Sequence, residues 1–249
     1  MDKNIFLILF VIILTSVGCS LHTTDNKLLK VIILSGMNNH EWEKTTSALE
    51  SLYNESGRFD VNTTENPSSL TKQMLSQFDV IVSNWTNYPE EKRLWGEEAE
   101  NAVIDFVRNG KGFVVFHASS VCFHDWPDFQ KIVGATWKEN LTDHCDIHTF
   151  QVTIEDREHP VTKGLETFEI KDELWHRMEV QPDAHILCRA YSDPEHGGSG
   201  LHEPVAFTTS FDKGRGFNLV LGHNINAMAN PAWKLLMLQG TEWAATGRE

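Results

Sequence analysis

The stretch FDVIVSNWTNYPEEKRLWGEEAENAVIDFVRNGKGFVVFHASS, residues 78–120, decides the fold. It opens with the apolar run 78–83 and closes with GFVVF at 112–116, and each run has the length of a fully buried strand. Between them, residues 90–107 carry an apolar stripe at helical spacing, and Asn109-Gly110 is a typical helix C-cap. A strand, a helix and a strand in this order predict two parallel strands joined by a crossover.

The sequence before this unit continues the alternation. Leu29–Leu34 predicts a buried first strand, residues 42–53 a helix, and FDVNTTE from Phe59 a second strand. Pro67 predicts the start of another helix.

The sequence after this unit changes character. Short β-like runs at 149–154, 184–190, 205–209 and 216–221 are separated by Gly and Pro turns, with a hairpin tip expected at Lys213-Gly214. Asn230-Pro231 predicts the start of a closing helix. We therefore predict an α/β fold of the doubly wound type, with a mainly parallel sheet and an added β-rich second half. Ligands of such sheets bind beyond the carboxyl ends of the strands.

The first 28 residues differ from the rest. Residues 1–19, MDKNIFLILFVIILTSVGC, combine an early Lys with a short apolar run and small residues, which predicts a signal peptide. The ending SVGC resembles the lipobox of bacterial lipoproteins, with Ser16 in place of the usual Leu, and predicts lipidation at Cys19; simple cleavage and release is the alternative. Residues 20–28 predict a polar tether and 29–249 one domain, exported and lipid-anchored at the bacterial cell envelope.

The composition limits the partners. The chain of 249 residues has a net charge of −14, which argues against nucleic acid or an anionic lipid surface and favours a small neutral ligand. Beyond Cys19 only Cys122, Cys145 and Cys188 remain, without a CxxC pair, so we expect small buried hydrophobic residues rather than a disulfide framework. The oligomeric state is left open.

Four polar clusters follow predicted strands. They are Asn38-Asn39-His40-Glu41-Trp42, Asn84-Trp85, the stretch 117–120 that begins with His117, and Gly222-His223-Asn224. A single histidine at a strand end is more often structural, but their recurrence at ends that meet on one edge predicts a shared functional cleft.

Asp172-Glu173-Leu174-Trp175-His176 is the densest polar cluster. It offers two carboxylates and an imidazole, the groups that general acid/base catalysis uses. A solvated turn anchored by Trp175 is the structural alternative.

Metal and sugar ligands are each suggested by a weaker pattern. His144 and His148 lie four residues apart, which makes them a candidate pair for a divalent metal, although the Glu of an HExxH site is missing; no other cofactor is expected. Eight tryptophans suit a sugar cleft, where indole rings pack against pyranose faces. The sequence lacks G-x-S-x-G, P-loop and G-x-G-x-x-G motifs, which disfavours the corresponding enzyme classes.

Seven short motifs in order resemble the ThuA-like (trehalose utilisation) family. They are HEW at 40–42, GKGFVVFHASS at 110–120, HPVTKGL at 159–165, DELWH at 172–176, GRGF at 214–217, LGH at 221–223 and EWAA at 242–245. The resemblance implies a class I glutamine amidotransferase-like, flavodoxin-related fold. In amidotransferases the turn after this fourth strand carries a nucleophilic Cys, whereas here the strand is followed by His117, and glutaminase chemistry is not expected.

The resemblance further implies carbohydrate catabolism, including the processing of 3-keto glycosides or disaccharides by elimination or hydrolysis. It suggests catalytic roles for Glu173, His176 and His117, with Glu173 or His176 as the base. Substrate-binding roles fall to the other cluster residues: His40, Glu41, Trp42, Asn84, Trp85, Asp172 and His223. A surface-anchored sugar-binding protein without catalysis and an interaction module with structural histidines are the alternatives.

Overall fold

The computed structural model describes residues 27–89, 92–123 and 125–248. The predicted signal peptide, Cys19 and most of the tether lie outside the described residues. Within the described ranges, no helix combines the length and apolarity needed to cross a membrane.

The fold is a mixed α/β fold around a nine-stranded sheet, in the order β2-β1-β3-β4-β13-β12-β11-β7-β8. The first five strands of this order run parallel, and the remaining four join through antiparallel pairs. The parallel strands are β1 (Leu29–Leu34), β2 (Phe59–Thr64), β3 (Val80–Ser83), β4 (Gly112–Phe116) and β13 (Gly214–Leu219). The others are β12 (His202–Phe211), β11 (His185–Tyr191), β7 (His148–Ile154) and β8 (Phe168–Asp172).

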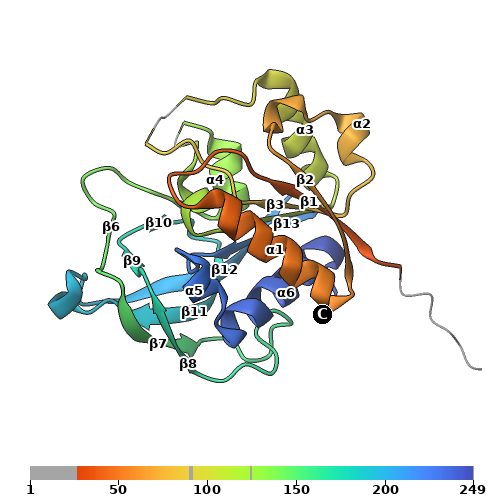
Figure 1. Ribbon diagram of the computed structural model, residues 1–249. Helices are drawn as coiled ribbons and strands as arrows, with labels where there is room; N and C mark the ends of the chain where they lie inside the picture. Colours follow the sequence, from red (N-terminus) through yellow and green to blue (C-terminus); the bar gives the residue numbers. More distant parts are fainter. Residues whose placement is uncertain (1–26, 90–91, 124, 249) are drawn as a thin grey trace, which may run out of the picture.

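Helices cover both faces of the parallel half (Figure 1). Alternate residues of β1 show why: Val31 and Ile33 enter one core and Ile32 and Leu34 the other. The first core packs against α1 (Trp42–Ser56), α5 (Ile225–Met228) and α6 (Pro231–Thr246); the second packs against α2 (Lys72–Leu75), α3 (Glu97–Arg108) and α4 (Pro127–Val133). The predicted doubly wound arrangement is thus confirmed.

Two predicted helices are shorter than expected. The helix expected over 90–107 begins only at Glu97, because Gly96, with φ +86, holds its N-cap in a conformation that favours glycine. Pro67 begins a single 3-10 turn, η1 (Pro67–Ser69). A separate short α-helix, α2, follows it. Thr71 is the N-cap of α2, and its side chain accepts a hydrogen bond from the Met74 N–H at 3.2 Å.

The second half contains elements that the sequence pattern did not predict. These are β8, α4, the two-stranded sheets of β5 (Ala135–Thr136) with β10 (Glu179–Val180) and of β6 (Asp143–His144) with β9 (Trp175–His176), and the 3-10 turns η2 (His117–Val121) and η3 (Pro194–His196). The hairpin tip lies one residue earlier than expected, at Asp212-Lys213, where Asp212 has φ +52.

The register of the parallel strands brings their carboxyl ends to one edge. Leu34 pairs with Ser83, Ser83 with Val115, and Leu219 with Phe116. The loops that follow these strands therefore meet at this edge, which is where the sequence placed the cleft.

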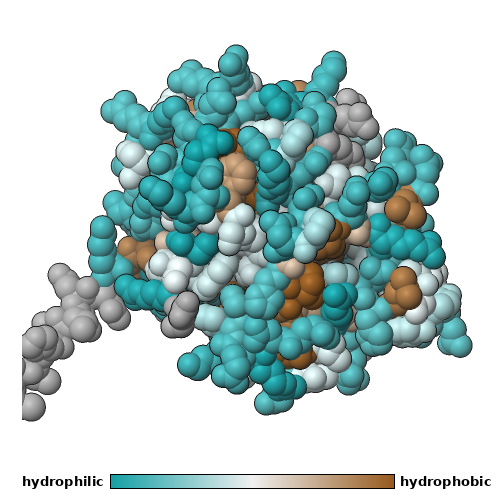
Figure 2. Space-filling model, turned by 180° about the vertical axis from the view of Figure 1, so that it is seen from behind, coloured by the Kyte–Doolittle hydropathy of each residue, from teal (hydrophilic) through white to brown (hydrophobic). Residues whose placement is uncertain are grey.

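The surface and the cysteines agree with what the composition of the chain predicts. Seen from behind, the surface is mostly hydrophilic and its hydrophobic residues form only small patches (Figure 2). Cys122, Cys145 and Cys188 are free and buried, as predicted. Burial raises the pKa of the Cys188 thiol to about 12, so its reactive thiolate is disfavoured.

Candidate functional site

His117 occupies the first position after β4, with φ +40. This left-handed conformation is unusual for a residue with a side chain, and such strain is often found at functional sites. The Nδ1 atom lies 3.0 Å from the carbonyl oxygen of Val220. Because a carbonyl only accepts, Nδ1 carries the hydrogen, and Nε2 is left as the acceptor atom of the ring.

His40 is held in the same way by the loop after β1. Its Nδ1 lies 3.1 Å from Oδ1 of Asn38 and 3.0 Å from Oδ1 of Asn39. The Asn38 amide is oriented by its own Nδ2, which donates to the carbonyl oxygen of Asn84 at 3.1 Å. Nδ1 of His40 therefore donates, and its Nε2 is the free acceptor.

His223 follows β13 and is fixed through its backbone. The fully buried Asp172 accepts hydrogen bonds from the N–H groups of Gly222 at 2.6 Å and His223 at 3.1 Å. Gly222 has φ +114, and a Cβ there would lie 2.8 Å from the indole nitrogen of Trp233. Asp172 thereby ties the end of β8 to the loop after β13, although three strands separate them in the sheet order.

Glu173 follows Asp172 and is 9 % exposed. Its Oε1 accepts a hydrogen bond from the indole N–H of Trp175 at 2.9 Å and lies 3.7 Å from Nε2 of His117. Its Oε2 lies 3.4 Å from Nδ1 of His223 and 3.4 Å from Nδ1 of His144. The carboxylate thus faces imidazole nitrogens on more than one side.

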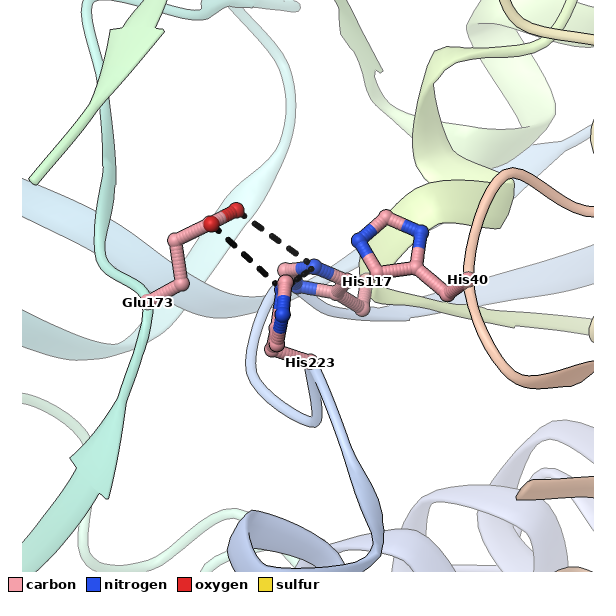
Figure 3. A group of neighbouring side chains, drawn as sticks. All are labelled: His40, His117, Glu173 and His223. Carbon is pink, nitrogen blue, oxygen red and sulfur yellow. Dashed lines mark hydrogen bonds and ion pairs between the residues drawn. The ribbon is translucent and has the colours of Figure 1, made fainter. Parts of the chain in front are cut away.

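Together, His40, His117, Glu173 and His223 form what we call the histidine cluster (Figure 3). One ligand atom from each lies within 4.8 Å of all the others, roughly twice the ~2.0–2.2 Å bond from zinc to nitrogen or oxygen. His117 Nε2 is 3.2 Å from His223 Nδ1. A single proton cannot serve all these acceptors at once, so the set fits a divalent cation of the kind that imidazole and carboxylate bind.

The electrostatics of the cluster favour neutral imidazoles at His40 and His117 and an ionised carboxylate at Glu173, the forms that bind a metal. Burial, reinforced by the neighbouring His40, lowers the pKa of His117 to about 3, and burial with His223 lowers that of His40 to about 4. Burial alone would raise the pKa of Glu173, but the His223 hydrogen bond, the charge of His117 and the Trp175 N–H together lower it to about 2. The hydrogen bond to Glu173 raises the pKa of His223.

A pocket of about 230 Å³ opens beside the histidine cluster. Its walls include His40 and Glu173 from the cluster. The remaining lining residues are Asn39, Tyr88, Ala118, Trp137, Asp143, His144 and Trp175. The cluster is therefore open to a small ligand.

Several predicted site residues lie outside this arrangement. His176 is buried but does not belong to the cluster, and burial, followed by the charge of Arg177, lowers its pKa. Asp172 makes its hydrogen bonds to backbone N–H groups and is not exposed to the pocket. Glu41 is exposed and pairs with Lys44.

The aromatic and amide residues predicted to bind substrate have structural contacts. Trp42 begins α1, is half-buried and does not line the pocket. The Asn84 amide donates to the hydroxyls of Thr45 and Thr46, each at 2.8 Å, and so ties β3 to α1. Trp85 is 3 % exposed and stacks on Phe123 in the core.

The predicted metal pair is separated. His144 lies at the pocket beside Glu173, whereas the buried His148 begins β7 and stacks on His196 with ring centroids 4.0 Å apart. Among the described residues, only the histidine cluster has the geometry of a metal group.

Two pocket residues were missed by the sequence analysis, Tyr88 and Trp137. Both stand outside the polar clusters that follow strands, so their place in the sequence gave no signal. The role of Asn38 in orienting His40 likewise depends on a contact with Asn84 that no spacing rule predicts.

A family model described as ThuA, trehalose utilisation, matches residues 30–244. This chain belongs to the ThuA family. The ThuA match covers the sheet, both helix layers and all four residues of the histidine cluster.

Solved structures show the same fold. A ThuA-like protein from Parabacteroides merdae is 30 % identical, with 89 % of this chain and 91 % of that chain covered and a TM-score of 0.80. A ThuA-like protein from Bacteroides uniformis is 20 % identical over 87 % of this chain and 91 % of that one, with a TM-score of 0.68. A protein from Salmonella typhimurium described as cytoplasmic is 14 % identical over 87 % and 99 %, with a TM-score of 0.61. No curated protein matches the chain.

Proposed function

We propose that this ThuA-family chain processes carbohydrates, acting on 3-keto glycosides or disaccharides by acid/base elimination or hydrolysis, with a divalent metal held by the histidine cluster. The observation that carries the proposal is the convergence of three imidazoles and one buried carboxylate beside a pocket lined by aromatic rings. A sugar-sized pocket next to a set of acid/base and metal-binding groups is the usual form of a small-molecule active site.

The metal would be held by His40, His117, Glu173 and His223. There it would act as a Lewis acid on the substrate's ketone oxygen and its neighbours. Asn38 and the Val220 carbonyl support this role because they hold two of the imidazoles in the tautomer that leaves Nε2 free.

Glu173 is better suited to holding charge than to taking a proton. With a pKa of about 2 it stays ionised at neutral pH and is a weak base. The Trp175 N–H fixes its orientation. We therefore assign it the task of balancing the positive charge of the centre.

His144 is the imidazole of the pocket wall that lies outside the cluster. In the elimination that we propose, it takes the proton from C2, which the ketone at C3 acidifies. The C2–H electron pair forms the C1=C2 bond as the C1–O bond breaks, and the departing oxygen takes up a proton to leave as an alcohol. Addition of water to the unsaturated product would complete a hydrolysis.

A non-catalytic sugar-binding protein is the second candidate. The observation that favours it is the aromatic wall of the pocket, which alone can bind a sugar ring. Turnover separates the two candidates, because a binding protein returns the glycoside unchanged.

The test is incubation of the purified chain with native and 3-keto forms of the same methyl glycosides and disaccharides, with and without chelator. We expect release of alcohol from the keto forms alone, and its loss on chelation. A chain that binds the keto glycosides but never releases alcohol would instead be the sugar-binding protein.

We also propose that the chain acts at the bacterial cell envelope, anchored through Cys19. The signal-like residues 1–19 support this. Labelling of the wild-type precursor with a radioactive fatty acid, and loss of the label in Cys19→Ser, is the expected result. Equal recovery of both forms in the cytoplasm would contradict it.

A further inference from the structure

A continuous series of ring contacts leads from the pocket to the histidine cluster. Tyr88 and Trp137 have centroids 5.9 Å apart, Trp137 and Trp175 are 5.1 Å apart, and Trp175 and His117 are 4.6 Å apart. Tyr88, Trp137 and Trp175 all line the pocket. The first two contacts are edge to face, with interplanar angles of 62° and 83°, so a flat ligand stacks on one ring of the series, and the series leads from there to the cluster.

The aromatic wall formed by Tyr88, Trp137 and Trp175 packs against a small hydrophobic core on one side and lines the pocket on the other. Trp175 is buried, and the half-buried Tyr88 and Trp137 pack on the small core that it forms with Ala135, Phe207 and Val220. Packing from one side fixes the rings, while Tyr88 and Trp137 remain partly exposed and all three rings line the pocket. Such a wall is preorganised to receive an apolar face without a large ordering cost.

Polar groups complete the lining. Asn39, Asp143 and His144 supply an amide, a carboxylate and an imidazole, which together can donate to and accept from neighbouring hydroxyls. An apolar face combined with a rim of hydroxyls is the chemistry of a pyranose ring.

The size of the pocket limits the ligand. Its volume of about 230 Å³ lies below the ~300–1,000 Å³ of pockets that bury drug-sized ligands. One sugar ring is a ligand of this size class, whereas two linked rings exceed it. The rest of a larger glycoside must lie in solvent.

We propose that this pocket is a single-ring subsite: it binds the terminal pyranose of a glycoside, with one face on Trp137 and the hydroxyls at Asn39, Asp143 and His144, and it leaves the group attached at C1 outside. This inference rests on the proposed function for the choice of a sugar. The reaction then accepts leaving groups of any size but only rings without bulky substituents. The reaction that supplies the keto glycoside must therefore oxidise the terminal ring of its own substrate.

Binding tests the subsite without turnover. Calorimetry on the purified chain would compare methyl hexopyranosides of the gluco, galacto and manno series, both anomers, with disaccharides and tetrasaccharides that end in the same ring. For the best ring, we expect Kd values within about three-fold across these lengths, because outer units contact solvent. A bulky 4,6-O-benzylidene group on the bound ring should weaken binding by more than about ten-fold, because the pocket has no room for it.

Variants locate the bound ring. Trp137→Ala should raise Kd by about ten-fold through loss of the aromatic contact, and Trp137→Phe, which keeps a ring, should raise it less. Trp243→Ala is the matched control, since Trp243 is also half-buried but lies on α6 at a different surface pocket. It should leave Kd unchanged.

The subsite would be overturned if each added sugar unit tightened binding more than ten-fold, if neither Trp137 variant changed Kd, or if no glycoside bound. Failure of the proposed function has a different outcome. In that case the methyl glycosides bind with the expected preferences, but the keto forms are never converted.

Discussion

The two edges of the parallel sheet use polar side chains in opposite ways. At the amino edge, Asp79 accepts a hydrogen bond from the Lys30 N–H at 3.0 Å and another from the Lys111 ammonium at 2.8 Å. The charges of Asp79 and Lys111 are thus paired with each other. At the carboxyl edge, the lone pairs of the histidine cluster converge on one another.

This difference separates polar groups that stabilise the fold from polar groups that we propose to bind a ligand. Burial alone would raise the pKa of Asp79, but Lys111 and the Lys30 N–H more than offset it and lower the pKa. The ionised Asp79 carboxylate thus stabilises the folded state at neutral pH. The cluster instead concentrates three imidazoles and a carboxylate whose ligand atoms face one another, an arrangement that we propose serves a cation or a substrate.

The largest effect is expected from Glu173→Gln, which keeps the shape but removes the only negative charge of the cluster. Turnover of a 3-keto glycoside should fall by about 10³-fold, the upper range for loss of one preorganised electrostatic group. Glu203→Gln is the control, because Glu203 is also buried, at 8 % exposure, but bonds to the Ser199 hydroxyl. Equal rates in the two variants would show that the Glu173 charge has no catalytic role.

His144→Gln should have the next largest effect. It removes the imidazole that we assign as the base and leaves the cluster intact, so the rate should fall about 10²-fold, within the range of general base contributions. Metal binding, measured by calorimetry with Mn²⁺ or Zn²⁺, should be unchanged. A loss of metal affinity equal to the loss of rate would make His144 a ligand instead.

Asp172→Asn tests the hydrogen bonds that position Glu173 and His223 in the cluster. The amide can no longer accept from all three of the Gly222, His223 and Glu173 N–H groups, so His223 and Glu173 lose their fixed spacing. Metal affinity should fall roughly ten-fold, at the lower end of the 10–100-fold losses typical of groups that orient ligands. Unaltered affinity would show that Asp172 acts only on folding.

Asp79→Asn at the amino edge should give the smallest effect, and on stability alone. The partly exposed ion pair is screened, so the free energy of unfolding at pH 7 should fall by about 1 kcal/mol or less. Because the folded-state pKa lies below the ordinary value of 3.8, this contribution is present above that value and is lost as the pH falls through the folded pKa. Urea unfolding at pH 7 and pH 3 should show the gap between wild type and variant narrowing, with turnover unchanged. A change in turnover would contradict the separation of the edges.

The parallel half was predictable because each of its signals is local. Runs such as 112–116 are apolar throughout, since both faces of their strands are covered, and their ends place His117 and His223 at one edge without further information. The antiparallel half gave weaker signals. Its strand β8 alternates between exposed and buried residues over only five positions, and the sequence pattern did not predict it.

The candidate site was predictable to the same extent. His40, His117, Glu173 and His223 were all named from strand ends or from the DELWH motif, and the structure brings them together. The metal geometry was placed elsewhere, at His144 and His148, because four-residue spacing suggests a shared face that β6 and β7 do not provide. Trp85 was placed in the cleft because it follows β3, yet it turns into the core with Trp95. In both cases tertiary packing, which the sequence pattern does not reveal, set the position of the side chain.

The most direct test of the histidine cluster as an active centre is the rate of methanol release from methyl 3-keto-glucosides, both anomers, by the chelator-treated chain during stepwise addition of Mn²⁺ or Zn²⁺. We expect no release at the start, a rise in rate with each addition, and a plateau near one ion per chain. A chelated, metal-free chain that releases methanol at the full rate would contradict it, as would a chain that stays inactive after binding the ion.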